Sequence, residues 1–334
     1  MARSISDRAL IALVAALTLA ACSGDPPREQ APQVQMDSDW AQVPEGVVFG
    51  EPSAVDVDSH GHIFVLHRAG REWVEPFPSD PIAEPTVFMF AANGKLLGKW
   101  GADTLVMPHG LSVDAEDKVW ITDVAREQVL RFSHDGTEEL ALGERAVTGQ
   151  GDGQFGRPAD IAFLPGKVLI ADGYLNDRVA VFDREGNFLE SWGEEGSDPG
   201  EFDLPHSIAT DANRVYVADR ENGRVQVLTH AGEPVASWKP KATGHPYSAK
   251  PIGGGYVLVI EGRDGAGRYG AIGRLYREDG SLERIFDAGV DPRTGTSLGH
   301  DIAVARDGSV YMVDNKANRV VKFELASAGL EKSE

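Results

Sequence analysis

A repeated unit of about 49 residues limits the fold of this 334-residue chain more than any other feature of its sequence. Six such units begin near residues 52, 108, 158, 205, 246 and 299, with an insertion in the first and the strongest divergence in the fifth. Each unit contains short runs rich in Val, Ile, Leu and Tyr, separated by turn sequences such as DREGN and REDG. Four short strands in a unit of this length are typical of one blade of a β-propeller. The sequence therefore predicts an all-β fold, a six-bladed β-propeller.

The ends of the repeat region predict how the ring closes. The sixth unit shows only three strands before the chain ends. We expect its outer strand to come from residues 40–50, because that strand would cover an open sheet edge. The propeller is accordingly expected over residues 40–326, followed by a short C-terminal tail at 327–334.

The N-terminal residues predict export. Two arginines precede an apolar stretch, residues 9–21, that is too short to span a bilayer as a mature helix. The stretch ends in LAAC, which resembles the lipobox of bacterial lipoproteins. Residues 1–22 are therefore expected to be a signal peptide and Cys22 the lipidated residue; the alternative is an ordinary secretory signal followed by a free thiol. Residues 23–39 are polar and Pro-rich, which is typical of a flexible tether. We expect an exported protein, lipid-anchored to a bacterial membrane on its periplasmic or extracellular face.

Charge and cysteine content limit the function further. The formal net charge of −20 excludes a general nucleic-acid-binding protein, because a polyanion repels phosphates. Cys22 is the only cysteine, so the mature domain has no disulfide and depends on its packed core. We expect it to be a monomer.

Three histidines recur at one position of alternate units. His109, His206 and His300 each begin an apolar, strand-like run in the second, fourth and sixth units. Equivalent positions of a propeller surround one axis, so these imidazoles should converge on the central channel. Three histidines with an open fourth position form the ligand set of a catalytic zinc site, although cobalt, nickel or iron could bind the same set. The alternative is that the histidine merely belongs to the repeat consensus.

Other polar residues of the units divide into two groups. Tyr174, Arg220 and Arg68 depart from the repeat pattern near the same end of the predicted channel. Guanidinium groups beside a metal suggest an anionic substrate, such as a carboxylate, and nearby positive charge would favour the phenolate of a candidate base. Residues that recur from unit to unit are expected to fix turns and ion pairs: Asp123, Asp172, Asp219, Asp314, Arg178, Arg224 and Arg319.

The remaining histidines follow no such symmetry. Most are expected in turns or on the surface: His60, His62, His67, His134, His230 and His245.

Several stretches together resemble the peptidyl-α-hydroxyglycine α-amidating lyases, a family of NHL-repeat propellers. They include VLHRAGREW, MPHGLSVD, ADGYLNDR, LPHSIA, VADRENGRVQ and GHDIAVARDGSVY, and the resemblance extends over residues 55–323 in the order of the family. It implies cleavage of the C–N bond of a C-terminal α-hydroxyglycine, which gives an amide and glyoxylate. The implied substrate is a small molecule or peptide that carries the hydroxyglycine carboxylate.

The resemblance also implies roles for single residues. It assigns a catalytic zinc ion to His109, His206 and His300, the catalytic tyrosine to Tyr174, and the active-site arginines to Arg68 and Arg220. It further implies a structural calcium ion bound by the backbone carbonyls of Val55 and Leu111 and the carboxylate of Asp301.

Departures from the family leave other functions open. The family's disulfide cysteines are absent, and the third histidine follows LG where the others follow MP or LP. A lyase acting on a related adduct such as ureidoglycolate, which has the same N–CH(OH)–COO⁻ centre, is one alternative. A non-catalytic NHL propeller that binds a peptide or protein partner is another. A lactonase-type propeller would instead centre on calcium held by acids and amides.

Overall fold

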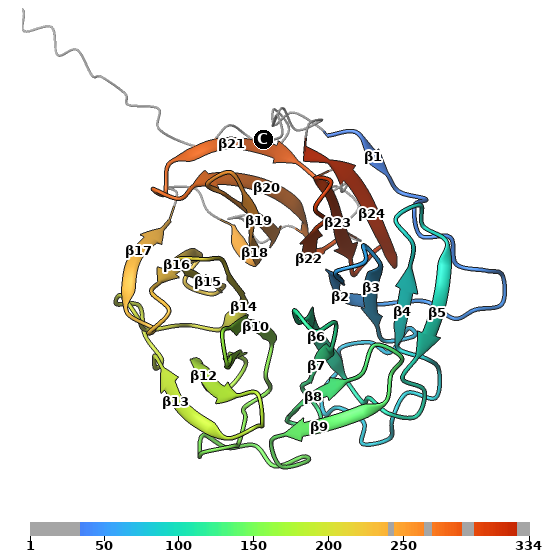
Figure 1. The fold of residues 1–334 in the computed structure, drawn as a ribbon, viewed down its shortest axis with the longest axis horizontal. Helices are drawn as coiled ribbons and strands as arrows, with labels where there is room; N and C mark the ends of the chain where they lie inside the picture. Colours follow the sequence, from blue (N-terminus) through green and yellow to red (C-terminus); the bar gives the residue numbers. More distant parts are fainter. Residues whose placement is uncertain (1–33, 240–243, 264–268, 289–296, 326–334) are drawn as a thin grey trace, which may run out of the picture.

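The computed structural model describes residues 34–239, 244–263, 269–288 and 297–325. These form six four-stranded antiparallel sheets arranged around a common axis (Figure 1). The predicted six-bladed β-propeller is therefore confirmed, and the described residues contain no α-helix.

Each blade runs from an innermost first strand to an exposed outer strand. The blades are, in order, β2 (Pro52–Val57), β3 (Ile63–His67), β4 (Val87–Phe90) and β5 (Leu96–Trp100); β6 (Pro108–Val113), β7 (Val119–Asp123), β8 (Gln128–Phe132) and β9 (Glu138–Leu142); β10 (Asp160–Leu164), β11 (Lys167–Asp172), β12 (Arg178–Asp183) and β13 (Phe188–Trp192); β14 (Pro205–Thr210), β15 (Val215–Asp219), β16 (Arg224–Leu228) and β17 (Pro234–Trp238); β18 (His245–Gly253), β19 (Tyr256–Arg263), β20 (Tyr269–Arg277) and β21 (Leu282–Asp287); and β22 (Gly299–Val304), β23 (Ser309–Asp314) and β24 (Arg319–Glu324) with β1 (Met36–Asp37).

Burial of both sheet faces explains the apolar runs in the sequence. Every residue of β7 and β15 is buried, because each blade is packed between two neighbouring blades. A strand that is covered on both faces needs a nearly continuous apolar run, as in VWIT of β7. The outer strand β13 has mostly exposed side chains, since it covers only the rim.

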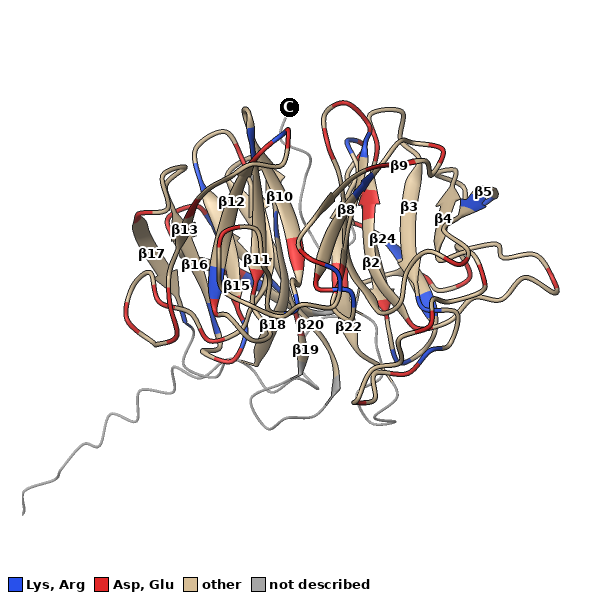
Figure 2. Ribbon diagram, turned by 90° about the horizontal axis from the view of Figure 1, so that it is seen from below, with Lys and Arg blue, Asp and Glu red and all other residues tan. Residues whose placement is uncertain are grey.

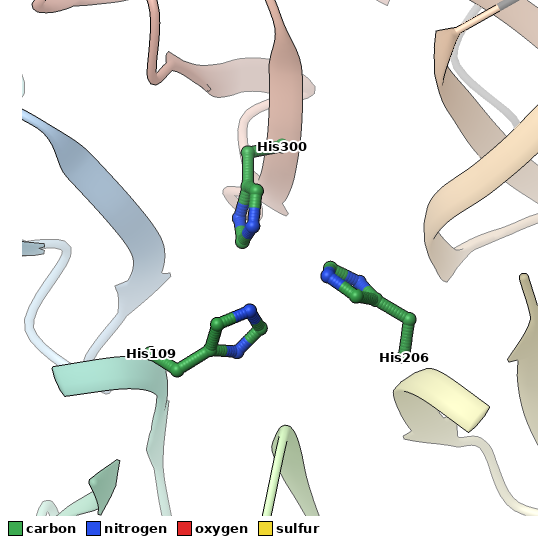
Figure 3. Close-up of side chains that lie close together, drawn as sticks. All are labelled: His109, His206 and His300. Carbon is green, nitrogen blue, oxygen red and sulfur yellow. The ribbon is translucent and has the colours of Figure 1, made fainter. Parts of the chain in front are cut away.

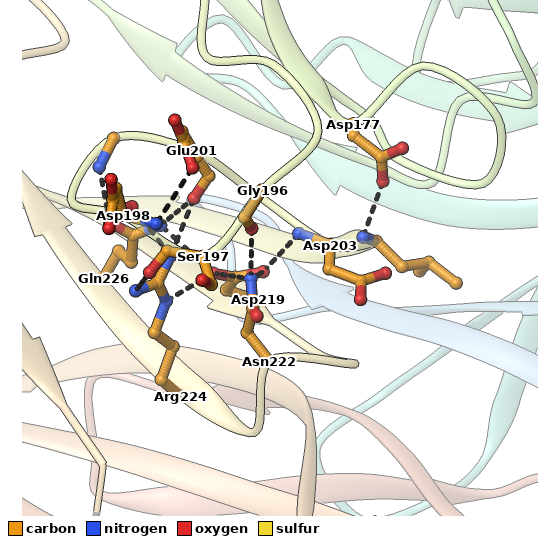
Figure 4. Close-up of polar contacts among 12 residues, drawn as sticks. Asp177, Gly196, Ser197, Asp198, Glu201, Asp203, Asp219, Asn222, Arg224 and Gln226 are labelled. Atoms are coloured by element: carbon orange, nitrogen blue, oxygen red, sulfur yellow. Dashed lines mark hydrogen bonds and ion pairs between the residues drawn. The ribbon is translucent and has the colours of Figure 1, made fainter.

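A recurring Asp–Arg pair fixes the loops between blades. In the fourth blade, Arg224 Nε donates to Asp219 Oδ2 over 2.6 Å, and its other nitrogens donate to the main-chain carbonyls of Ser197, Asp198 and Glu201 (Figure 4). The charged pair is buried and satisfies carbonyls that the strands leave free. Equivalent pairs occur at 3.0 and 3.1 Å, Arg178–Asp172 and Arg319–Asp314. The structural role predicted for these residues is therefore confirmed.

The ring closes at a different place from the one expected. Met36 and Asp37 form β1 and pair with Phe323 and Lys322 of β24, so residues 40–50 do not supply the closing strand. Trp40 instead packs against Phe90 and Tyr311, with ring centroids 5.4 and 4.8 Å away. Met36 and Asp37 fall within the stretch predicted as a tether, residues 23–39, and they belong to the propeller. Two residues suffice to pair with this edge, and so short a strand leaves no periodic pattern in the sequence.

Other predictions fall outside the described residues. Cys22, the signal peptide, most of the tether and the tail at 327–334 lie there. The described residues contain no helix that is long and apolar enough to cross a membrane. Figure 2 shows Asp and Glu on the loops at both ends of the blades, with Lys and Arg interspersed among them.

Candidate active site in the central channel

Irregular strand pairing directs three histidines toward the propeller axis. His109, His206 and His300 are the second residues of the inner strands β6, β14 and β22, and the register of each strand shifts at that point. A bulge leaves one residue out of the ladder and re-aims its side chain. The imidazoles of three alternate blades consequently face one another (Figure 3).

The three rings form a nearly equilateral triangle. Each pair of ring centroids is separated by 4.9 Å. One nitrogen from each ring lies within 4.8 Å of the other two. The structure therefore brings together the residues that the repeat symmetry singled out.

The intervening blades orient these rings. Each histidine Nδ1 faces a main-chain carbonyl, which can only accept, so Nδ1 carries the hydrogen and Nε2 keeps its lone pair. The acceptors lie at the equivalent positions of the third, fifth and first blades, at 2.8, 2.7 and 2.6 Å: Ala159, Tyr247 and Ser53. Alternate blades thus supply the imidazoles and the groups that fix their tautomers, an arrangement typical of metal-binding histidines.

Burial keeps these imidazoles neutral. Their exposed fractions are only 2, 2 and 6%. Burial lowers the pKa of His109 and His206 well below the usual value, and burial with the nearby Arg68 lowers the pKa of His300 to about 3. Nε2 of His206 has no hydrogen-bond partner, although an unsatisfied buried acceptor costs about 1–3 kcal/mol. Three neutral, converging nitrogen donors fit a divalent transition-metal ion such as zinc.

Tyr174 reaches this triangle from the loop after β11. Its hydroxyl oxygen lies 2.9 Å from Nε2 of His109, and it donates the hydrogen because that nitrogen holds a lone pair. The loop approaches β14 closely: a Cβ on Gly173 would lie 2.1 Å from the carbonyl oxygen of Pro205. A glycine is therefore needed beside the tyrosine.

Two arginines flank the tyrosine. Arg220 Nη1 lies 3.5 Å from the Tyr174 hydroxyl, and its Nε donates to Glu221 over 2.9 Å. Arg68 is 3% exposed; its Nε donates to the Pro108 carbonyl over 2.9 Å, and its Nη2 is buried without a partner. Burial lowers the pKa of Arg68 from a very high value, so the guanidinium stays charged. An unpaired buried guanidinium nitrogen is suited to an anion that enters this space.

Two aromatic residues of the site, Trp73 and Tyr247, were not predicted from the sequence. Trp73 belongs to the insertion between β3 and β4, and its ring centroid lies 5.1 Å from that of Tyr174 and 5.8 Å from that of His109. Tyr247 lies 4.9 Å from His206, with the guanidinium carbon of Arg220 5.1 Å from its ring. The insertion itself was the available signal for Trp73, because insertions in repeat proteins map to loops on one face.

The residues expected to bind calcium lie on the inner strands of three successive blades. Val55 of β2, Leu111 of β6 and Asp301 of β22 are all buried. Asp301 Oδ2 accepts the Val55 N–H over 3.2 Å, and Oδ1 accepts the Ser248 hydroxyl over 2.8 Å. The carboxylate is therefore already held by two neighbouring blades.

A lysine side chain lies beside that carboxylate. Nζ of Lys250, on β18, lies 3.9 Å from Asp301 Oδ1 and 3.5 Å from Asp160 Oδ2. Burial acts to lower the pKa of Lys250, but Asp160, Asp301 and Asp56 raise it overall, so the group is an ammonium ion. A calcium ion bound to Asp301 would meet this charge at close range. The surroundings do not fit a calcium ion while Lys250 keeps its place.

Known proteins resemble this chain over most of its length. The NHL repeat profile matches residues 202–228. The chain is 33% identical over 304 residues to the mouse (Mus musculus) peptidyl-glycine α-amidating monooxygenase, which covers 84% of this chain but only 31% of that protein. It is 31% identical over 300 residues to a probable peptidyl-α-hydroxyglycine α-amidating lyase of Caenorhabditis elegans, which covers 83% of each chain. The chain thus spans about a third of the length of the monooxygenase.

Solved structures share the fold. A gluconolactonase of Xanthomonas campestris superposes with a TM-score of 0.62 at 12% identity, over 88% of this chain and 94% of that one. At this identity the likeness concerns the propeller architecture alone.

Proposed function

Because the chain belongs to the family of peptidyl-α-hydroxyglycine α-amidating lyases, we propose that it cleaves the carbon–nitrogen bond of an N-acyl-α-hydroxyglycine and releases an amide and glyoxylate. The observation that carries this proposal is the meeting of three tautomer-fixed imidazoles with the Tyr174 hydroxyl in one buried space. A purely structural channel would not need an unpaired buried acceptor such as His206 Nε2.

The three histidines would hold zinc through their Nε2 atoms. When bound, the ion would supply positive charge and Lewis acidity to the hydroxyl oxygen of the substrate. The Nδ1–H bonds to Ser53, Ala159 and Tyr247 keep the rings from rotating.

The arginines would orient the substrate through its carboxylate. Arg68 offers Nη2, which has no partner within the protein, while its Nε anchors it to the Pro108 carbonyl. Arg220 is held by Glu221 and keeps Nη1 near Tyr174. Trp73, whose ring lies 5.2 Å from the Arg68 guanidinium carbon, would cover one side of the bound acid and exclude water.

Tyr174 would transfer the hydroxyl proton of the substrate to the leaving nitrogen. The lone pair of His109 Nε2 that accepts the Tyr174 hydrogen would be occupied by a bound zinc ion, and Arg220, whose Nη1 lies 3.5 Å from the Tyr174 oxygen, would stabilise the phenolate left after that hydrogen is lost. The phenolate oxygen then takes the proton of the substrate hydroxyl. The oxygen–hydrogen electron pair then forms the carbonyl bond of glyoxylate as the carbon–nitrogen bond breaks. The leaving nitrogen takes up the proton that Tyr174 has accepted, so the products contain all the atoms of the substrate and no water is consumed.

The experiment measures glyoxylate release from N-benzoyl-α-hydroxyglycine by the zinc-loaded protein. We expect rapid release that is abolished in His206→Ala. Ureidoglycolate in the same assay tests the related-adduct alternative. Release from neither compound by folded, metal-loaded protein would favour a propeller that binds a partner without catalysis.

For the location of the protein we propose export and a lipid anchor on Cys22, with the propeller at the membrane surface. The proposal is supported by the apolar stretch that ends in LAAC. Fractionation of cells tests it: the wild type should sediment with membranes and Cys22→Ser should not.

A further inference from the structure

A second cluster of metal-ligating side chains lies where the first two blades meet. Asp58 and His62 belong to the turn between β2 and β3, and His134 belongs to the turn between β8 and β9. Asp58 follows the end of an inner strand, whereas the channel histidines lie at the start of theirs. The cluster is therefore at the opposite end of the propeller from the candidate active site.

Two imidazoles converge on one carboxylate oxygen. His62 Nδ1 lies 2.8 Å from Asp58 Oδ2, and His134 Nε2 lies 2.9 Å from the same atom. The three ligand atoms are all within 4.8 Å of one another. A small outward shift of each ring would admit a cation at the bond lengths of about 2.0–2.2 Å that zinc takes to nitrogen and oxygen.

The carboxylate is held in place by the backbone. The side chain of Asp58 is fully buried, and its other oxygen, Oδ1, accepts the main-chain N–H groups of His60 and His62 over 2.9 and 2.7 Å. The His134 ring packs edge-on against Phe64, with centroids 5.1 Å apart. Such second contacts orient ligands in protein metal sites.

A further donor stands beside these three. His60 Nδ1 lies 3.9 Å from Asp58 Oδ2 and 3.3 Å from Asp117 Oδ2. Its side chain is 66% exposed, and those of His62 and His134 are 33% and 37% exposed, so a cation can enter from solvent. The remaining coordination position can be taken by His60 or by water.

We propose that Asp58, His62 and His134 bind a second divalent transition-metal ion of the zinc class. Two imidazoles and a carboxylate are ligands that zinc, nickel and copper accept, and the ion would join a turn of the first blade to a turn of the second. It lies too far from the channel to take part in the reaction. The site stands independently of the proposed lyase function.

Metal content separates this site from the channel site. After zinc loading and dialysis, we expect two zinc ions per chain in the wild type, one in His206→Ala and one in the double variant His62→Ala/His134→Ala. The double variant should keep its glyoxylate release. His230→Ala is the matched control, because His230 occupies the corresponding turn of the fourth blade and its Nε2 lies 3.1 Å from the carbonyl oxygen of Asp211; this variant should bind as many ions as the wild type.

A second readout does not depend on activity. In the His206→Ala background, zinc should raise the melting temperature by mass action, and the additional change His62→Ala should remove that shift. Circular dichroism checks that each variant is folded. Equal zinc content in the wild type and in a folded His62→Ala/His134→Ala protein would overturn the proposal, whether or not the channel histidines bind an ion of their own.

Discussion

The hydroxyl oxygen of Tyr174 and Nε2 of His109 are 2.9 Å apart, and the direction of their hydrogen bond is set on the far side of the imidazole. His109 Nδ1 must donate to the Ala159 carbonyl, so the lone pair lies on Nε2, where it accepts the tyrosine hydrogen; a zinc ion bound to Nε2 would take the place of that hydrogen. The carbonyl of Ala159, in the third blade, thus determines where the hydroxyl hydrogen of Tyr174 points, because it fixes the tautomer of His109.

Replacement of the tyrosine hydroxyl should impair proton transfer and little else. In Tyr174→Phe we expect kcat to fall by about 10²–10⁴-fold, the usual contribution of general acid–base catalysis, with KM little changed. Zinc content should equal that of the wild type. Steady-state glyoxylate release and elemental analysis measure both. Unchanged kcat in a metal-loaded Tyr174→Phe protein would remove Tyr174 from the mechanism.

Replacement of Arg68 should weaken the binding of the substrate carboxylate. The unpaired Nη2 is lost in Arg68→Lys, and a hydrogen bond to a charged group contributes about 1.5–3 kcal/mol, so kcat/KM should fall by about 10–100-fold. N-(hydroxymethyl)benzamide, which lacks the carboxylate, serves as a competitive probe. Its inhibition constant should be the same in both proteins; an equal loss for both ligands would indicate a general disturbance of the site.

Acid should destabilise the fold through a buried histidine of β3. His67 is fully buried against Phe88, its Nδ1 accepts the Ala69 N–H over 3.0 Å, and Nε2 has no partner. Burial lowers the pKa of this imidazole to about 3, below its unfolded value of about 6.5. The unfolded chain therefore binds one more proton below pH 6.5, and stability is lost as the pH falls toward 3.

Urea unfolding of the metal-free protein at two pH values tests this relation. Between pH 7.5 and 5.0 His67 should account for about 2 kcal/mol of the loss in unfolding free energy. In His67→Gln, which does not titrate, the difference between the two pH values should shrink by that amount. The same pH dependence in both proteins would mean that His67 is protonated in the fold or is not the responsible group.

Features that the repeat imposes on every blade could be predicted from the sequence. Strand runs, turn sequences and the Asp–Arg pairs recur, and His109, His206 and His300 stand out because they break that recurrence in alternate blades. Their convergence then follows from the symmetry of the ring.

Features that occur in one blade only, and that depend on a contact with a distant segment, could not be predicted from the sequence. Trp73 lies in an insertion that has no counterpart in the other units, β1 pairs through two residues only, and Lys250 lies in the most divergent blade. His67 resembles the turn histidines in the sequence, yet it is fully buried. Each depends on a contact between segments far apart in the chain, which local patterns do not encode.

Because of Lys250, the stability of the propeller should not depend on calcium. Its ammonium lies near the buried carboxylates of Asp160 and Asp301 and the half-buried carboxylate of Asp56, so it supplies the positive charge that a bound cation would otherwise provide. We expect purified wild-type protein to contain no calcium and to keep its melting temperature in EGTA. Lys250→Ser leaves the carboxylates uncompensated, so that protein should be less stable and should gain melting temperature when millimolar calcium is added.

Two further variants test whether the response to calcium comes from the lost positive charge of Lys250. Lys250→Arg keeps the positive charge and should remain insensitive to calcium. Lys167→Ser removes a surface lysine that pairs with Glu190 at 2.8 Å, and it should not respond to calcium either. One tightly bound calcium ion in the wild type, with a melting temperature that drops in EGTA, would instead show that the ion and the lysine share the channel.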